Sequence, residues 1–173
     1  QHGSIGPFNP AYHYSGETVK NAFADYFLGW GEEWLSGVQL PCPKANQLPI
    51  GYPYISLQKA ELEGRSKEPI VAIFSQRPIG VELSKFAIDL LGYLPEDWSI
   101  VFKLHPREAH DARERYPKLY SSKIKVIDKE QIGLHDLLSR AAIQVGVSST
   151  VLYEGLAFGC KTYVAKLPRW EIV

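Results

Sequence analysis

The chain has 173 residues, of which 45% are hydrophobic, and this is enough for one compact unit with an appendage. Its nineteen basic and nineteen acidic residues cancel, so no global field attracts nucleic acid and we expect no nucleic-acid partner. No run approaches the roughly eighteen apolar residues that a membrane-spanning helix needs.

The first 40 residues are rich in aromatic residues and glycine and have no sustained hydrophobic period. Prolines punctuate residues 41–69, which we expect to be a connector. From residue 70 onward, continuous apolar runs alternate with amphipathic segments. They predict strands at 70–75, 99–104, 124–127, 142–147 and 162–165, and helices at 80–93, 108–116, 132–141 and 149–158. This alternation predicts an α/β fold with a doubly wound parallel sheet.

Cysteine and histidine are sparse in this sequence. Cys42 lies in a proline-flanked loop and Cys160 in an apolar helical run, so they form neither a disulfide framework nor a paired-ligand motif, which favours a reducing, cytoplasmic setting. The five histidines lack paired spacing and no Asp-x-Asp triplet is present, so we expect no metal and no other cofactor. The chain starts at Gln1 and contains no methionine, from which we expect a fragment of a longer protein.

Ligands of doubly wound sheets bind at the carboxyl ends of the strands, so the loops that follow the predicted strands are the first candidates for a site. Three of these loops carry polar side chains that we expect to face one crevice. They are Ser75-Gln76-Arg77-Pro78, Lys103-Leu104-His105-Pro106-Arg107-Glu108 and Ser148-Ser149-Thr150.

The third loop joins an apolar strand to a hydroxyl-rich helix start. The first N–H groups of a helix lack intrahelical partners and the macrodipole is positive there, so this point suits a phosphate. Ser148, Ser149 and Thr150 can cap the helix and donate hydroxyls, and Glu154, one turn later, can reach a ribose. The alternative interpretation is that the serines serve only as an N-cap.

The second loop contains a histidine followed by proline. Proline keeps the preceding residue extended, which would direct the His105 imidazole into the crevice, although a purely structural turn is the alternative. Arg77 and Lys103 could pair with phosphate, or could be solvated residues at strand ends. His110 and His135 fall in predicted helices, and we expect both to face solvent.

Two other chemistries do not fit the sequence. The run around Ser148 differs from a hydrolase nucleophile elbow, because position 150 is threonine instead of glycine and no histidine follows. A dinucleotide-binding domain would need a Gly-x-Gly-x-x-Gly turn, which is missing.

Taken together, His105-Pro106 and Ser148-Ser149-Thr150 make the chain similar to the C-terminal, nucleotide-binding half of GT-B glycosyltransferases. The similarity points to bacterial sialyl- and polysialyltransferases of capsule synthesis and to CDP-glycerol glycerophosphotransferases of teichoic acid synthesis. In those families His-Pro and Ser-Ser or Ser-Thr motifs bracket the cytidine nucleotide and its phosphate. The resemblance implies a Rossmann-like domain. It also implies nucleotide or phosphate contacts from Gln76, Arg77, Lys103, His105, Pro106, Ser148, Ser149, Thr150 and Glu154.

The beginning of the chain also resembles these proteins. Gln1-His2-Gly3 looks like a Gln-His-Gly motif late in their N-terminal half, and residues 26–31 and 50–53 look like stretches that join the halves. The resemblance implies that residues 1–50 are the tail of an acceptor-side domain with a connector, and residues 51–173 the nucleotide-binding domain. We expect His2 and His105 to be catalytic, His2 as the base on the acceptor hydroxyl. A loop histidine at a chain end is the alternative for His2, and His13 is a weaker candidate.

The implied activity is metal-independent transfer of a sugar or polyol phosphate from a CMP- or CDP-linked donor to a glycan or polyol acceptor in bacterial surface polysaccharide synthesis. We expect a cytoplasmic protein at the inner face of the membrane, peripherally associated with membrane-bound polysaccharide machinery. One alternative is a nucleotide-sugar 2-epimerase, whose Asp-Ser-Gly signature differs from Val147-Ser148-Ser149. Another is a non-catalytic GT-B-like binding module. We expect the isolated chain to bind nucleotide weakly and to turn nothing over.

Overall fold

The structure, a computed structural model, describes residue 5 and residues 12–14, 23–128 and 130–172. The chain divides into two compact units, with the boundary between Leu57 and Gln58. This boundary falls within helix α2 (Pro53–Glu61), inside the segment expected to be a connector. The helix begins at a proline, which is favoured at the first helical position because its missing N–H would have no partner there.

The first unit contains a small parallel sheet of β1 (Phe27–Gly29) and β2 (Gln47–Pro49). Between these strands lie α1 (Glu32–Ser36) and the short 3-10 helix η2 (Lys44–Asn46). A Cβ atom on Gly29 would lie 2.7 Å from Leu35 Cδ2, so the glycine gives α1 the room to pack closely on β1. The buried core of this unit comprises Ile5, Val38, Leu40 and Cys42.

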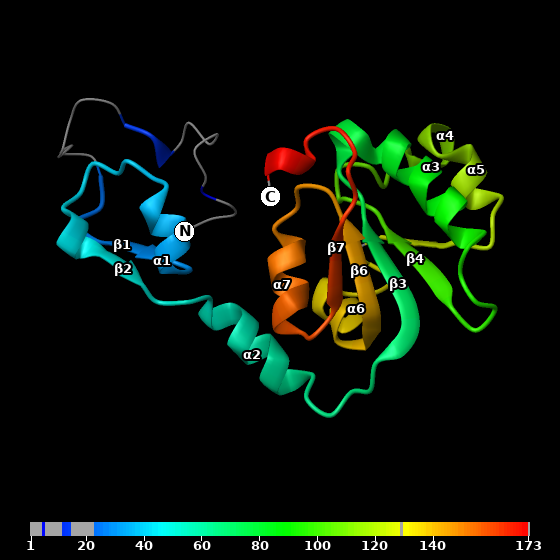
Figure 1. The fold of residues 1–173 in the computed structure, drawn as a ribbon, viewed down its shortest axis with the longest axis horizontal. Helices are drawn as coiled ribbons and strands as arrows, with labels where there is room; N and C mark the ends of the chain where they lie inside the picture. The colour runs from blue at the N-terminus through cyan, green and yellow to red at the C-terminus, as the bar shows by residue number, and fades with distance from the viewer. Residues whose placement is uncertain (1–4, 6–11, 15–22, 129, 173) are drawn as a thin grey trace. The chain divides into compact units, whose positions relative to one another are not determined.

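The second unit is built on a five-stranded sheet in which every neighbouring pair of strands is parallel (Figure 1). The strands are β3 (Glu68–Phe74), β4 (Ser99–Lys103), β5 (Lys125–Ile127), β6 (Ala141–Gly146) and β7 (Lys161–Val164), in the order β5-β4-β3-β6-β7. All five correspond to strands predicted from the apolar runs. Counted from β3, this order is 3-2-1-4-5, which is the Rossmann order 3-2-1-4-5-6 without its sixth strand.

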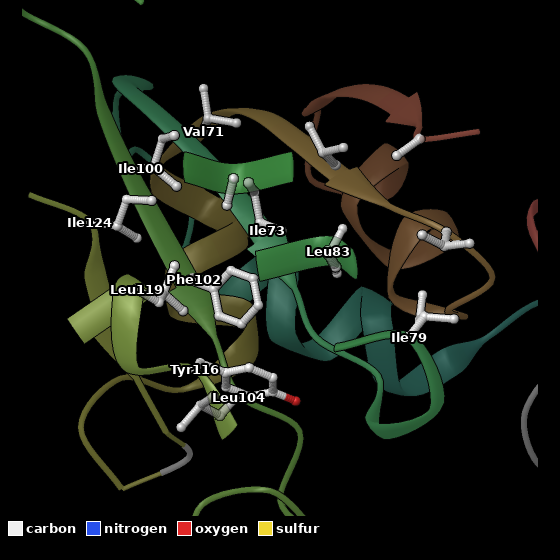
Figure 2. Packing of buried hydrophobic residues seen from close by; sticks show 14 of the residues in the cluster. Val71, Ile73, Ile79, Leu83, Ile100, Phe102, Leu104, Tyr116, Leu119 and Ile124 are labelled. Carbon is white, nitrogen blue, oxygen red and sulfur yellow. The ribbon is translucent and has the colours of Figure 1, made fainter. Parts of the chain in front are cut away.

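Helices cover both faces of this sheet. Side chains alternate along β3: Val71 and Ile73 join the core formed with α3 (Gly80–Leu91) and α5 (Pro117–Tyr120). Figure 2 shows this packing around Phe102. Ala72 and Phe74 join the opposite core, formed with α6 (Leu134–Arg140). The predicted α/β class and doubly wound sheet are therefore confirmed.

Two predicted elements differ in detail. Residues 108–116 do not form one helix: a turn leads into α4 (Ala112–Arg115), and Pro117 then starts α5. The final helix α7 (Val151–Ala157) starts two residues later than expected. Short 3-10 helices η3 (Arg77–Ile79) and η4 (Trp170–Ile172) complete the described elements.

Candidate functional site

The strand order changes direction between β3 and β6, and the loops that leave their carboxyl ends are joined there. Gln76 Oε1 accepts a hydrogen bond of 3.1 Å from the Ser148 backbone N–H, and Gln76 Nε2 lies 3.4 Å from Ser148 Oγ. One side chain therefore couples two loops that are 72 residues apart in sequence. In open α/β sheets this switch point is where ligands bind.

A pocket of about 210 Å³ lies at this edge of the sheet. The His-Pro loop contributes His105 and Pro106 to its lining, and the loop after β6 contributes Ser149. The remaining lining residues are Phe74, Ser75, Lys103, Leu104, Leu134 and Val151. The structure thus brings together the imidazole and a hydroxyl of two motifs more than forty positions apart.

The exposed His105 ring is oriented by its own loop. Its Nδ1 accepts a hydrogen bond of 3.1 Å from the Arg107 backbone N–H, and the Glu108 N–H donates to the His105 carbonyl at 2.8 Å. Because Nδ1 acts as an acceptor, the proton of the neutral imidazole is on Nε2. The outer ring nitrogen is therefore a hydrogen-bond donor, which suits an anionic or carbonyl oxygen.

The Lys103 ammonium is held by backbone carbonyl groups. The residue is buried, and Nζ donates to Asp128 O at 2.9 Å and to Ile132 O at 2.5 Å. Burial lowers the pKa of Lys103, and the nearby Asp128 charge offsets part of this effect. The ammonium charge therefore lies within the pocket wall. The same hydrogen bonds hold the segment that precedes α6 in place.

Arg77 does not line the pocket. Its exposed guanidinium donates to Arg107 O at 2.6 Å and to Asp111 Oδ2 at 3.0 Å, while Arg115 donates to the Arg77 carbonyl. These bonds join the loop after β3 to the His-Pro loop and to α4. In this arrangement Arg77 cross-links two loops instead of facing the pocket.

The expected hydroxyl cap of α7 is made by one residue only. Thr150 occupies the N-cap position with a helical backbone conformation (φ −60°, ψ −21°) and makes no side-chain cap hydrogen bond. Ser149 Oγ instead accepts from the Val151 N–H at 3.3 Å. An N-cap side chain usually reaches back from an extended backbone, which Thr150 does not have.

The Glu154 carboxylate is already engaged. Its Oε2 lies 2.8 Å from His135 Nε2, and only 12% and 11% of the two side chains are exposed. His135 Nδ1 lies 3.2 Å from Gln58 Oε1, and the ring stacks on Phe158. The expectation that His135 faces solvent was wrong, because its ring is enclosed by Glu154, Phe158 and Gln58. His110 is 71% exposed, as expected.

Two residues of the loops after β3 and β4, Ser75 and Glu108, were missed as site residues. Ser75 is buried and lines the pocket, and its hydroxyl, although near the Tyr116 phenol, makes no hydrogen bond within the described part of the chain. Glu108 is fully buried directly behind His105 and bonds to its backbone N–H. A glutamate three residues after a turn-forming residue is the spacing of a capping box, and this signal could have identified Glu108.

The remaining predictions concern two histidines, metal sites and membrane-spanning helices. His2 lies outside the described residues, whereas His13 forms a backbone bridge with Gln39 in the first unit. Within residues 5, 12–14, 23–128 and 130–172, no group of three His, Cys, Asp or Glu side chains could hold a metal ion. Across the same residues, no helix combines the length and apolarity needed to cross a bilayer.

No protein family and no curated protein matches this sequence. Among solved structures, the wall teichoic acid polymerase TagF matches with a TM-score of 0.51 and 15% identity, over 81% of this chain and 38% of TagF. KpsC, a beta Kdo 2,7 transferase of Thermosulfurimonas dismutans, matches with a TM-score of 0.38 and 14% identity, over 65% of this chain and 41% of KpsC. A family 9 glycosyl transferase of Veillonella parvula matches with a TM-score of 0.42 and 14% identity, over 75% of this chain and 40% of that protein.

The chain spans less than half the length of each of these proteins. At 15% identity the TagF match describes the fold alone. In fold, this chain is similar to GT-B glycosyltransferases, and its five-stranded parallel sheet is consistent with one Rossmann-like half of that architecture.

Proposed function

We propose that this chain is the nucleotide-binding part of a metal-independent GT-B glycosyltransferase of bacterial surface polysaccharide synthesis. The donor is a CMP- or CDP-linked sugar or polyol phosphate, and the acceptor is a glycan or polyol. Residues 1–50 belong to the end of an acceptor-side domain and its connector, and residues 51–173 bind the donor. In the cell, the protein works at the inner face of the membrane beside membrane-bound polysaccharide machinery.

One observation carries this proposal: His105 and Ser149 line one pocket at the switch point of the sheet. The Nε2–H group of His105 and the hydroxyl of Ser149 are donors, and the buried Ser75 hydroxyl has unused hydrogen-bonding capacity among the described residues. The Lys103 ammonium adds positive charge to the wall. Donors beside a buried cation form a suitable environment for a phosphate group.

The chemistry follows from the charge that develops when the bond to the nucleotide phosphate breaks. The Nε2–H group of His105, the hydroxyls of Ser149 and Thr150 and their backbone N–H groups stabilise the leaving phosphate without a metal. Each well-placed donor contributes about 3 kcal/mol to such stabilisation. A base from the acceptor side activates the acceptor hydroxyl, and His2 is our candidate for this role.

The remaining predicted residues support the pocket in different ways. Gln76 holds Ser148 in place, and Arg77 holds the His-Pro loop. We assign Glu154 to the donor ribose, where a ribose hydroxyl would share the carboxylate with His135.

Nucleotide titration of the chain, followed by NMR of backbone amides, tests the proposal. CMP and CDP should perturb the loops after β3, β4 and β6, and the affinity should fall in His105→Ala and in Ser149→Ala. A hydrogen bond to a charged group contributes about 1.5–3 kcal/mol, so each variant should weaken binding about 10- to 100-fold.

Two matched variants serve as controls. His110→Ala removes a histidine that is 71% exposed, and Ser121→Ala removes an exposed serine hydroxyl that bonds only locally to Lys118 O. Neither should change the affinity. Equal binding by His105→Ala and the wild type would contradict the proposal. A preference for UDP would favour the epimerase, and no response to any nucleotide would favour the binding module.

A further inference from the structure

A fully buried carboxylate lies behind the His-Pro turn. Glu108 has no exposed surface, and its Oε2 accepts a hydrogen bond of 3.0 Å from the His105 backbone N–H. The Glu108 N–H in turn donates to the His105 carbonyl at 2.8 Å. Residues 105 and 108 are thus joined by a backbone hydrogen bond across the turn and by the glutamate side-chain bond that forms one half of a capping box.

This pair closes a four-residue turn that determines the orientation of the imidazole. Pro106 occupies the second position of the turn, where its fixed φ is favourable. Arg107 occupies the third position, and its N–H is the group that donates to His105 Nδ1. If the turn loosens, the Arg107 N–H moves away from Nδ1 and the ring loses its preferred tautomer and direction.

The second oxygen of Glu108 is held from the core. Oε1 accepts a hydrogen bond from the Tyr116 hydroxyl, and the Tyr116 ring packs beside Phe102 in the core seen in Figure 2. Burial, followed by the interaction with Glu108, raises the pKa of Tyr116 to about 12. A Cβ atom on Gly80 would overlap Tyr116 Oη and would lie 2.6 Å from Glu108 Oε1, so α3 can start here only with glycine.

We infer that Glu108 is the positioning residue of His105: anchored to the core by Tyr116, it fixes the turn that presents the Nε2–H group of His105 to the pocket. The inference rests on the proposed nucleotide site for its purpose, but the tautomer of His105 tests the geometry without any nucleotide. A buried carboxylate with both oxygens bonded is costly to disturb, because loss of one partner leaves a charged oxygen unpaired.

Glu108→Ala is the principal variant. Alanine removes both acceptor oxygens, so the His105 N–H and the Tyr116 hydroxyl both lose their partner. Tyr116→Phe is the second variant, since it keeps the carboxylate and removes only the anchor. Glu114→Ala is the matched control, because Glu114 is an exposed glutamate of α4 that lies outside the pocket containing His105.

The experiment measures the imidazole ¹⁵N shifts of His105 and the CMP affinity of each variant that retains the wild-type fold by circular dichroism. In the wild type and in Glu114→Ala, the neutral ring should be the Nε2–H tautomer. In Glu108→Ala it should become a mixture of tautomers, with CMP binding about tenfold weaker, as expected for loss of one hydrogen bond. Tyr116→Phe should shift both readouts in the same direction by a smaller amount.

The inference is overturned if a folded Glu108→Ala keeps the wild-type tautomer. It is also overturned if the tautomer changes while the CMP affinity of the variant equals that of the wild type. Absence of CMP binding by the wild type would count against the proposed function alone, and the tautomer comparison would then decide the positioning role of Glu108.

Discussion

Replacement of Gly155 by alanine should destabilise the second unit through a single buried contact. A Cβ atom at this position of α7 would overlap the side-chain amide of Gln144, meeting Cδ, Oε1 and Nε2 together. Gln144 is fully buried on β6, and its Nε2 donates to Leu152 O at 2.6 Å and to Thr162 Oγ1 at 2.7 Å. The amide can therefore move aside only by losing these hydrogen bonds.

The size of the effect follows from opposing terms. Overpacking a filled core costs about 1–3 kcal/mol, and each hydrogen bond lost by Gln144 adds about 1 kcal/mol. Alanine is favoured over glycine in a helix by about 1 kcal/mol, which offsets part of the loss. We expect Gly155→Ala to lower the free energy of unfolding by about 2 kcal/mol, or the Tm by about 4–8 °C in a domain of this size.

A double-mutant cycle measured by urea unfolding tests this reasoning. In a Gln144→Ala background the overlapping amide is gone, so adding Gly155→Ala should be neutral or stabilising, with a coupling of about 2 kcal/mol between the sites. Gly92→Ala is the control, because its nearest new contact would be Asp89 O at an ordinary 3.5 Å. Additive effects of the two substitutions, or a Gly155→Ala variant as stable as Gly92→Ala, would refute the packing argument.

Two further predictions concern pairs of polar side chains. The pKa of Tyr116 is raised to about 12, so its neutral form stabilises the fold fully below pH ~10, and this contribution is lost as the pH rises towards ~12. Between pH 9 and pH 11 the free energy of unfolding should therefore fall by about 1 kcal/mol more in the wild type than in Tyr116→Phe. Equal falls in the two proteins, measured by urea unfolding at each pH, would disprove this. For the partly buried His135–Glu154 pair, alanine substitutions should show a coupling of about 1 kcal/mol, and additivity would count against the pair.

Much of the fold could be predicted because strand and helix periods are local properties. Five apolar runs predicted the five strands of the parallel sheet, and the alternation with helices predicted helices on both faces. The neighbourhood of His105 and Ser149 followed from the same reasoning, since the carboxyl ends of parallel strands meet at one edge. The helix α2 was missed because its apolar residues have no clear helical period and prolines precede it.

The partners of the polar side chains could not be predicted in this way. Glu108, expected to begin a helix at 108–116, is fully buried because its side chain turns back to the His105 backbone and is covered by Tyr116. Arg77 pairs with Asp111, and Glu154 meets His135, although nothing in the spacing of these residues indicates either contact.

By itself, the sequence determined the class of the fold, the order of its elements in the chain and the loops that carry polar groups, because these depend on residues a few positions apart. Only the tertiary structure decided which polar groups face the pocket and which hold the surrounding loops in place. That choice depends on how helices from distant parts of the chain cover each face of the sheet, and burial then forces every charged or polar group there to find a partner.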